Sequence, residues 1–288
     1  MNGREEMIKM ADNLELYSRI YESGKNHWLV AVHGIGEHCD RHEYLVDLFR
    51  DRFNICLFDL RGHGRSEGRR TFISNFRDFY NDLYDVLKFL KTSYRMEKYD
   101  LFGHSMGGLI SVGFCKFFAS ESVLPEKLLV NAPPVGVGGV TGKIVNQIPT
   151  RIINGLTDLP YTLRLSGLIN LDYLSHDPAV KSDYLSDDLI NKNPHSKLLL
   201  ELIKASRYVF SGPLGVDLPI LCTAGSEDEV IDFDLVKDFF EHEQRGSEFK
   251  AINGAYHEIH LEIEKYRKPY FQTLRDFLIT ENASFQAP

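Results

Sequence analysis

Short apolar runs alternate with longer stretches of helical periodicity along most of this chain. Five runs are nearly unbroken in apolar character, at residues 28–32, 55–58, 100–102, 127–130 and 220–222, and a weaker one follows at 248–252. Runs of this kind are typical of parallel strands that are covered on both faces. Between them lie amphipathic segments, and from Phe76 to Leu90 apolar residues recur at helical spacing. The alternation predicts an α/β fold, with a mostly parallel sheet flanked by helices.

The alternation stops between residues 135 and 215. A glycine-rich stretch at residues 135–139 is followed by helical patterns with no strand between them. Two apolar stripes stand out. One consists of Ile144, Ile148, Ile152 and Leu156 and is interrupted by Pro149, and the other consists of Leu198, Leu199, Leu202 and Ala205. We expect most of these side chains to face the core, while some line an apolar pocket. The sequence therefore predicts a core at residues 1–134 and 216–288 and an inserted helical cap at residues 135–215.

Composition and charge describe an ordinary globular chain. Its 288 residues are 43% hydrophobic and 26% charged, with a formal net charge of −8. No basic run exceeds two residues, which argues against nucleic acid as a partner because phosphate binding needs a basic face. The N-terminus lacks the pattern of a signal peptide, and no apolar stretch approaches the ~18 residues of a membrane span, so we expect a cytoplasmic location.

The four cysteines share no Cys-x-x-Cys spacing, and three of them lie in apolar segments. A thiol in such a segment behaves as a small core side chain. We therefore expect Cys39, Cys56, Cys115 and Cys222 to be reduced, and mostly buried.

The pattern Gly-x-Ser-x-Gly occurs twice, and the context separates the two copies. Ser66 is followed by charged residues that predict a polar loop. Ser105 follows an apolar run and precedes Gly107, Gly108 and further small residues, which allow a helix to approach the sheet closely. That strand–turn–helix context is typical of a nucleophile elbow, in which a strained turn projects the serine hydroxyl from the sheet. Ser105 is therefore the candidate nucleophile.

A serine nucleophile needs a general base and a carboxylate that orients the base. In an elbow-containing fold the acid follows the serine in the chain and the histidine comes last. Asp228 is the preferred acid because it lies at the tip of an acidic turn, where Glu227 and Glu229 are the alternatives. His257 is the preferred base over His260, because it would lie at the N-terminal edge of a last helix that begins near residue 258. We expect His260 at the surface or behind the site.

The oxyanion of such a reaction requires two preorganised N–H donors. Met106, directly after the candidate nucleophile, supplies one, and Ile35, in the loop after the first strong strand, supplies the other. The alternative for the glycine pair around Ile35 is a plain tight turn, and a dinucleotide site is disfavoured because the third glycine is missing. His33 and His38 have no helical register for a metal, and we expect neither a metal nor a cofactor.

Five motifs stand in a characteristic order along the chain: His33-Gly-Ile-Gly-Glu-His38 with Arg41, then residues 59–68, 103–108, 225–228 and 255–258. In this order they resemble those of the monoacylglycerol lipase and lysophospholipase group of α/β-hydrolases, also described as serine aminopeptidase-like hydrolases. The resemblance covers nearly the whole chain. It implies the same assignment for all five positions: Ser105 as nucleophile, Asp228 as acid, His257 as base, and the amides of Ile35 and Met106 as oxyanion donors.

The resemblance also implies an activity. The expected reaction is cofactor-independent cleavage of the ester of a single-acyl glycerolipid, a monoacylglycerol or a lysophospholipid, through an acyl-enzyme. The cap carries eight Lys and Arg residues against seven Asp and Glu residues, so we expect the cap, more than the acidic body, to meet lipid at a membrane surface. The head group, the acyl preference and the oligomeric state are not set by the sequence.

The chain departs from the family in three ways. His42 stands where an aromatic residue usually follows the arginine of the first loop, the strands before Trp28 are short, and the cap is the least similar region. These departures leave a small-ester carboxylesterase or a peptidase as alternatives on the same frame. A non-catalytic hydrolase-like protein that binds an apolar ligand is the alternative from a different class.

Overall fold

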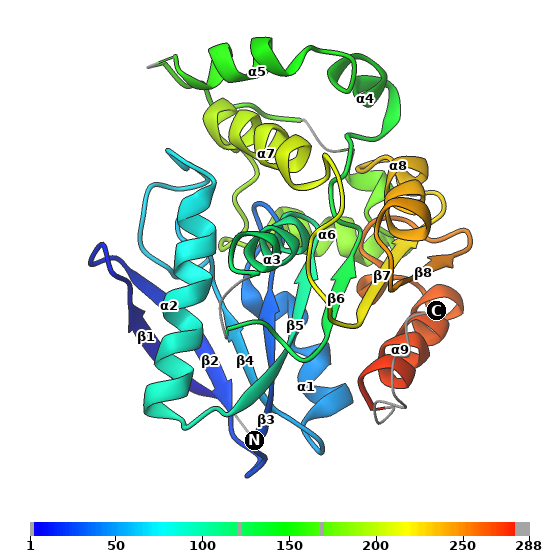
Figure 1. The fold of residues 1–288 in the computed structure, drawn as a ribbon. Coiled ribbons are helices and arrows are strands. Elements are labelled where there is room, and N and C mark those ends of the chain that lie inside the picture. Colours follow the sequence, from blue (N-terminus) through cyan, green and yellow to red (C-terminus); the bar gives the residue numbers. More distant parts are fainter. Residues whose placement is uncertain (1–2, 120–122, 160, 168–169, 280–288) are drawn as a thin grey trace.

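The computed structural model describes residues 3–119, 123–159, 161–167 and 170–279. Within them one sheet has the strand order β1-β2-β4-β3-β5-β6-β7-β8 (Figure 1). Its strands are β1 (Arg4–Lys9), β2 (Glu15–Tyr21), β3 (His27–Val32), β4 (Asn54–Phe58), β5 (Lys98–His104), β6 (Leu128–Asn131), β7 (Ile220–Gly225) and β8 (Ser247–Ile252). β1 and β2 pair antiparallel, β2 pairs antiparallel with β4, and β3 to β8 run parallel. The predicted mostly parallel sheet is confirmed.

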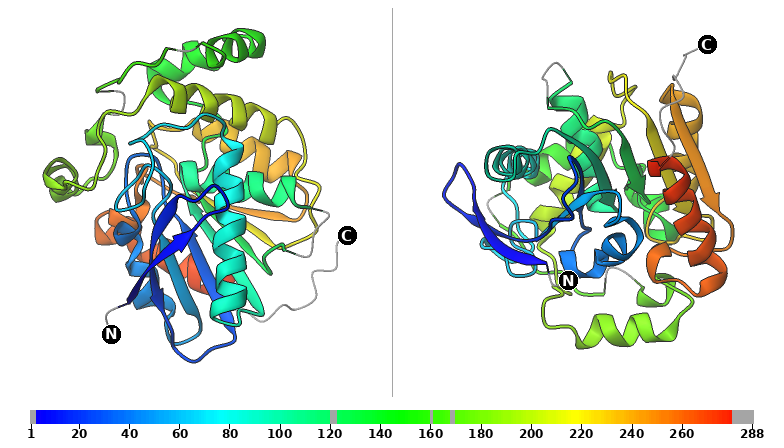
Figure 2. Two further views of the ribbon diagram at one scale, coloured as in Figure 1. Left: turned by 90° about the vertical axis from the view of Figure 1, so that its left-hand side faces the viewer. Right: turned by 90° about the horizontal axis from the view of Figure 1, so that it is seen from below.

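Both faces of the central strands are covered. On one face the strand residues Val30 and Val32 pack with α2 (Arg77–Ser93) and α3 (Met106–Phe117). On the other face Leu29 and Ala31 pack with α1 (Tyr44–Phe49) and α9 (Glu264–Ile279). Since successive strand residues point to opposite faces, burial on both sides requires the unbroken apolar runs seen in the sequence. Figure 2 shows these layers from the side and from below.

The two N-terminal strands do not carry such runs. Exposed and partly exposed residues make up most of β1, and exposed or half-buried positions are mixed with buried ones in β2. An antiparallel edge that is open to solvent on one face needs only part of its residues to be apolar. The criterion of unbroken apolar runs therefore finds β3 to β7, marks β8 only weakly, and misses β1 and β2.

Residues 135–215, the inserted segment, lie between the paired strands β6 and β7. They form α4 (Gly139–Val145), α5 (Thr150–Thr157), a short 3-10 turn η2 (Leu171–Tyr173), α6 (Pro178–Ser186) and α7 (Ser196–Val209). In the described part of the segment the only β-structure consists of two isolated bridges, one between Val137 and Ile231 and one between Arg164 and His195. α4, α5 and α7 lie above the carboxyl edge of the parallel strands, at the top of Figure 1.

The two apolar stripes of the inserted segment have different outcomes. On α7, Leu198 is fully buried, and Leu202 and Ala205 pack against the main core, as predicted. The core-facing prediction is wrong for the first stripe, three of whose members are exposed, Ile144 at 68%, Ile152 at 47% and Leu156 at 40%, while Ile148 is half-buried. α4 ends at Val145 and Pro149 is the N-cap of α5, so the helical phase restarts, and the buried positions of α5 are Ile153 and Thr157.

The remaining elements are short and follow strand ends. They are the 3-10 turn η1 (Cys39–His42), α8 (Phe233–Asp238) with the π-helical turn η3 (Phe239–Glu243), and the 3-10 turn η4 (Ile259–Leu261). All four cysteines are unpaired and buried, as predicted. None of the described helices is long and apolar enough to cross a membrane.

Candidate active site

Ser105 occupies the sharp turn between β5 and α3. Its backbone lies at φ 52° and ψ −120°, a region that residues with a side chain rarely adopt. A Cβ on Gly107 would lie 2.1 Å from the carbonyl oxygen of Val32, and one on Gly103 would lie 2.4 Å from the carbonyl oxygen of Gly107. The close approach of α3 to the sheet therefore requires glycine on both sides of the serine, and the turn aims its hydroxyl at the carboxyl edge.

Three side chains from three different loops meet at this edge. His257, in the loop after β8, places its Nε2 3.0 Å from the Oγ of Ser105. Its Nδ1 lies 2.7 Å from the Oδ2 of Asp228, in the loop after β7. All three residues are at least nine-tenths buried. The structure thus brings together the three residues that the sequence proposes as nucleophile, base and acid.

The acidic turn offers three carboxylates, and its backbone selects one. The Oδ1 of Asp228 accepts hydrogen bonds from the N–H groups of Val230 at 2.8 Å and Ile231 at 3.1 Å, which leaves Oδ2 for the histidine. Glu227 and Glu229, on either side of it, are exposed to solvent. Asp228 is the one carboxylate of this turn that is hydrogen-bonded to His257.

The protonation equilibrium of His257 reflects two opposed effects. Burial lowers the pKa of the imidazole, while the charge and hydrogen bond of Asp228 raise it, and the nearby carboxylates of Glu258 and Glu37 act in the same direction. The pKa of His257 lies above its ordinary value as a result. An imidazole with a raised pKa is a stronger base, and its protonated form is stabilised where a proton would arrive from Ser105.

The loop after β3 lies directly against the nucleophile. A Cβ built on Gly34 would lie 3.2 Å from the Cβ of Ser105. Ile35 follows, partly buried, at the carboxyl edge. On the other side Met106 is the first residue of α3, where a helix leaves its N–H groups without intrahelical acceptors. The two residues predicted as oxyanion donors therefore flank Ser105.

A buried network of charges fixes this loop to the residue after the candidate base. The carboxylate of Glu37 accepts hydrogen bonds from the backbone N–H of Gly34, from the Nε of Arg41 at 3.1 Å and from the Nε2 of His42 at 3.1 Å. Arg41 also donates to the Oε2 of Glu258 at 2.6 Å. Although burial raises the pKa of Glu37, its cationic and imidazole neighbours hold it well below the usual range.

Glu37, Arg41 and Glu258 are motif positions to which the sequence alone assigns no role. The structure makes them positioning residues, because they hold the loop of Ile35 and the loop of His257 together. One signal was available in the sequence: Glu37 and Arg41 are four residues apart, at the spacing of a favourable ion pair.

His260 is buried behind the site and is not at the surface. It is 2% exposed, and its ring packs against those of His42 at 4.9 Å, Tyr44 at 5.1 Å and His104 at 5.2 Å. The prediction of a helix that begins near residue 258 is wrong. The buried carboxylate of Glu262 accepts hydrogen bonds from the backbone N–H groups of residues 256 and 263. The chain therefore turns there, and α9 begins only at residue 264.

Ser66, the other serine in a Gly-x-Ser-x-Gly pattern, has a structural role. Its Oγ accepts a hydrogen bond from the N–H of Tyr17 at 2.9 Å and donates one to the carbonyl oxygen of Asp59 at 2.6 Å. The first contact ties the loop of residues 59–68 to β2, and the second joins the two ends of the loop. A hydroxyl used in this way is not poised as a nucleophile.

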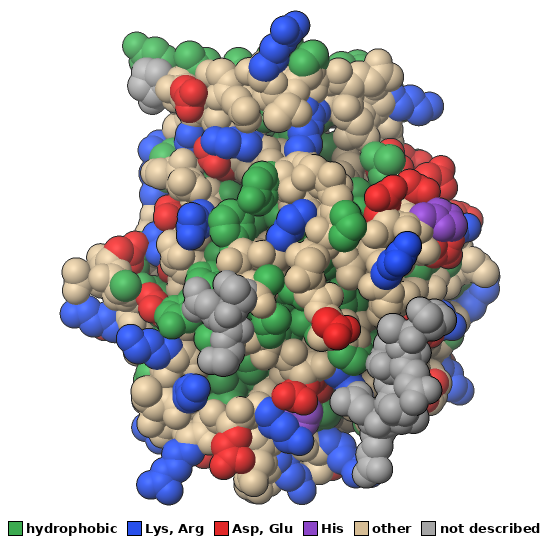
Figure 3. Space-filling model, viewed as in Figure 1, with side chains coloured by type: hydrophobic (Ala, Val, Ile, Leu, Met, Phe, Trp, Pro, Cys, Tyr) green, Lys and Arg blue, Asp and Glu red, His purple; other side chains and the backbone are tan. Residues whose placement is uncertain are grey.

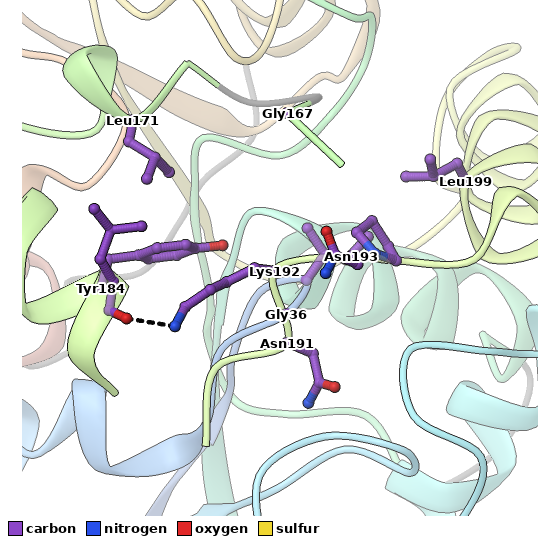
Figure 4. Close-up of a pocket in the computed structure, with 11 residues that line it drawn as sticks. Gly36, Gly167, Leu171, Tyr184, Asn191, Lys192, Asn193 and Leu199 are labelled. Atoms are coloured by element: carbon purple, nitrogen blue, oxygen red, sulfur yellow. Dashed lines mark hydrogen bonds between the residues drawn. The ribbon is translucent and has the colours of Figure 1, made fainter. Parts of the chain in front are cut away.

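A cavity of about 250 Å³ lies beside the loop of Ile35, under the inserted segment (Figure 4). Leu171 and Leu199 give it apolar walls, and Tyr184 faces it from α6. At its rim Lys192 donates a hydrogen bond to the carbonyl oxygen of residue 185. The cavity is mainly apolar and adjoins the loop that flanks the nucleophile, as expected of a site for an apolar substrate group.

Comparison with known proteins identifies similar chains and similar folds. The chain is similar to the monoglyceride lipase of Rattus norvegicus, with 29% identity over 259 residues that cover 88% of this chain and 83% of that protein. Its fold is similar to that of the Paleococcus ferrophilus monoacylglycerol lipase, with a TM-score of 0.80, 23% identity, and coverage of 92% of this chain and 98% of that one.

A second solved structure has the same fold. It is a soluble variant of the monoglyceride lipase from Saccharomyces cerevisiae, in complex with a substrate analog, with a TM-score of 0.79, 18% identity, and coverage of 96% of this chain and 95% of that one. The family described as serine aminopeptidase, S33 (Hydrolase_4) matches residues 24–264. The chain therefore belongs to this serine aminopeptidase (S33) family of hydrolases and has the α/β-hydrolase fold.

Proposed function

We propose that this protein is a serine hydrolase that cleaves the carboxylic ester of a single-acyl glycerolipid, a monoacylglycerol or a lysophospholipid, through an acyl-enzyme. The observation that carries the proposal is the continuous hydrogen-bonded chain from Ser105 through His257 to Asp228, which begins at a serine held in a strained turn. This arrangement can activate a hydroxyl as a nucleophile at neutral pH.

The proposed reaction uses the groups of the chain in order. Neutral His257 accepts the proton of Ser105 at Nε2 as the hydroxyl attacks the ester carbonyl, and Asp228 holds the Nδ1–H and stabilises the imidazolium. The N–H groups of Ile35 and Met106 donate to the oxyanion. His257 then gives its proton to the departing alcohol, and a water molecule that it deprotonates hydrolyses the acyl-enzyme.

Two observations support a lipid ester as the substrate. The cavity beside Ile35 has apolar walls from Leu171 and Leu199, which suit an acyl chain better than a charged group. The relatives named above are described as lipases of monoacylglycerols, and the identity of 29% extends over most of both chains. Of the two candidate substrates, monoacylglycerol is therefore the one we expect to be cleaved faster.

We propose further that residues 135–215 act as a cap that contacts a lipid surface. Hydrophobic side chains line the upper edge of the molecule in Figure 3, over α5 and α4. Between residues 139 and 163, in and beside α4 and α5, five apolar side chains of the described residues are more than half exposed: Val140 at 80%, Ile144 at 68%, Leu159 at 52%, Tyr161 at 84% and Leu163 at 69%. An apolar group of this size on a face with little net charge is typical of a surface that binds lipid or another apolar partner.

A fluorophosphonate probe tests the nucleophile directly. We expect Ser105→Ala to abolish labelling and to lower ester turnover by several orders of magnitude, because triad members act as a unit. Ser66→Ala is the matched control, since it alters the serine of the other Gly-x-Ser-x-Gly pattern, and it should still be labelled. Undiminished labelling and turnover in Ser105→Ala would show that the assignment is wrong.

Side-by-side hydrolysis of monoacylglycerols and lysophosphatidylcholine of increasing chain length tests the substrate class. We expect kcat/KM to rise with the length of the acyl chain, because burying each added methylene group in an apolar pocket is favourable by about 0.8 kcal/mol. A flat series would indicate a small-ester esterase, and preferential cleavage of a peptide p-nitroanilide would indicate a peptidase. Retention of a fatty ester without turnover would indicate a binding protein.

A further inference from the structure

Three side chains that can bind a metal converge behind the triad. They are Glu37 in the loop after β3, His42 at the end of η1 and His260 in η4, and one ligand atom from each lies within 4.8 Å of those of the other two. Their exposed fractions are 3%, 1% and 2%, so the cluster is sealed from bulk solvent. Two imidazoles and a carboxylate form a donor set that suits Zn²⁺.

Three of the four imidazole nitrogens in this cluster lack a hydrogen-bond partner among the described residues, the exception being the Nε2 of His42, which is bonded to Glu37. Neither ring nitrogen of His260 has a hydrogen-bond partner among the residues that the structure describes, and the same is true of the Nδ1 of His42. Buried polar atoms in proteins are almost always paired, so an unpaired buried imidazole requires an explanation, such as a bound ion or water. A neutral imidazole presents one nitrogen lone pair, which is the group that a transition metal takes up.

The charge balance around the cluster favours a cation. Two buried carboxylates, of Glu37 and Glu258, share the single guanidinium of Arg41. Burial raises the pKa of Glu258 above its ordinary value, against the lowering effect of Arg41. When both carboxylates are ionised, the network carries one negative charge in excess, in a place where an unbalanced charge is costly. A bound cation would offset that charge, whereas an anion would add to it.

We propose that Glu37, His42 and His260 form a site for a divalent transition metal, with Zn²⁺ as the best match, and that occupancy of this site inhibits the hydrolase. Tetrahedral coordination at about 2.0–2.2 Å from the ion places ligand atoms roughly 3.4 Å apart. The three ligand atoms therefore have to close from separations of at most 4.8 Å, a change that side-chain rotation can supply. A water molecule completes the four ligands.

The location explains the inhibition. The carboxylate of Glu37 also accepts a hydrogen bond from the backbone N–H of Gly34, and the loop that contains Gly34 lies against Ser105. A metal that draws this carboxylate away loosens the loop that carries the proposed oxyanion donor. The added positive charge also lies one ring away from His257, because the ring of His104 packs against those of both His260 and His257, with centroids 5.2 and 5.1 Å apart. Both effects raise the barrier to proton transfer from the nucleophile.

The test measures metal content and inhibition separately. The full chain is stripped with a chelator, equilibrated with ZnCl₂ and freed of unbound metal, and the zinc per chain and the initial rate on p-nitrophenyl butyrate are measured. We expect about one zinc per chain and a loss of activity that a chelator reverses. His42→Phe and His260→Asn should each abolish the bound zinc and raise the concentration for half-inhibition at least tenfold, relative to each variant's own zinc-free rate.

The substitution at residue 42 should be accommodated, because the rings of Tyr44 and Phe102 lie 6.0 and 5.9 Å from that of His42 and would pack against a phenyl group. The exposed His242 provides the control, and His242→Phe should bind and respond to zinc as the unaltered chain does. His260→Asn tests the same site without relying on the first variant.

The outcomes separate this site from the triad. If both ligand variants keep their zinc and their inhibition, the metal is bound elsewhere, for example by His257 and Asp228, and the proposal is refuted. An unaltered chain that binds no zinc refutes it as well. The effect on turnover rests on the proposed function, but the metal content does not. Ser105→Ala should therefore still bind one zinc per chain, even if the chain proves not to be a hydrolase.

Discussion

The substitution Asp228→Asn replaces one oxygen of a buried carboxylate by an NH₂ group and leaves the shape of the side chain unchanged. The structure determines which way the new amide faces. The N–H groups of Val230 and Ile231 both donate to the Oδ1 position, at 2.8 and 3.1 Å, so the amide oxygen must remain there. The NH₂ group then occupies the Oδ2 position, 2.7 Å from the Nδ1 of His257.

This orientation reverses the hydrogen bond to the histidine. The NH₂ group donates to Nδ1, so the ring proton moves to Nε2, which faces the hydroxyl of Ser105 at 3.0 Å. A protonated Nε2 cannot accept the proton of the nucleophile. The same change of tautomer in serine proteases lowers kcat by about 10⁴-fold, which corresponds to about 5.4 kcal/mol in the activation free energy.

The assay is kcat on p-nitrophenyl butyrate for Asp228→Asn, with thermal unfolding as a check that the fold is intact. Glu227→Gln is the matched control, because it makes the same chemical change at the neighbouring exposed carboxylate and should stay within about twofold of the unaltered chain. A loss of less than tenfold in Asp228→Asn, or an equal loss in the control, would refute the reasoning.

Three further predictions address stability and pH dependence. Gly107→Ala should lower the free energy of unfolding by about 3 kcal/mol or more, because its Cβ would lie 2.1 Å from the carbonyl oxygen of a strand residue. Gly155→Ala, on α5 with open space around it, should raise the free energy of unfolding by about 0.5–1 kcal/mol. Urea unfolding measures both. In the same assay Leu198→Ala should cost about 2–5 kcal/mol and the exposed Ile144→Ala less than about 0.5 kcal/mol, and equal losses would contradict the burial of α7. Finally, burial lowers the pKa of His257, but the carboxylate of Asp228 raises it by more, so the net shift is upward. Because the base must be neutral to act, kcat/KM should rise with pH through a midpoint above the ordinary value of about 6.5. A midpoint below that value would contradict the raised pKa.

Local patterns predicted the parts of the fold that are governed by local rules. Parallel strands covered on both faces need unbroken apolar runs, and the strained turn at Ser105 needs glycine on either side, so β3 to β7 and the turn itself were found in the sequence. The order of nucleophile, acid and base along the chain then limited the search to two late loops. In one of them the choice of Asp228 rested on its place at the tip of the turn.

The parts that local rules did not predict depend on contacts between distant residues. The late start of α9 follows from the carboxylate of Glu262, which captures N–H groups on both sides of the turn. The network of Glu37 and Arg41 joins residues more than 200 positions apart, since Arg41 pairs with Glu258. The burial of His260 could not be read from its spacing to His257, because that spacing was interpreted as helical and the segment forms a 3-10 turn.

The pairing of β6 with β7 has a consequence for how such a protein can diversify. Leu128 lies opposite Ile220 in the sheet, although the whole inserted segment separates them in the chain. The sheet is therefore complete without that segment. The loop of His257 nevertheless contacts it, because the N–H groups of His257 and Glu258 donate to the carbonyl oxygens of Tyr173 at 3.3 Å and Leu174 at 2.8 Å. New lengths or sequences in the rest of residues 135–215 can alter which molecules reach Ser105, while the strands and turns that hold the proposed triad stay unchanged.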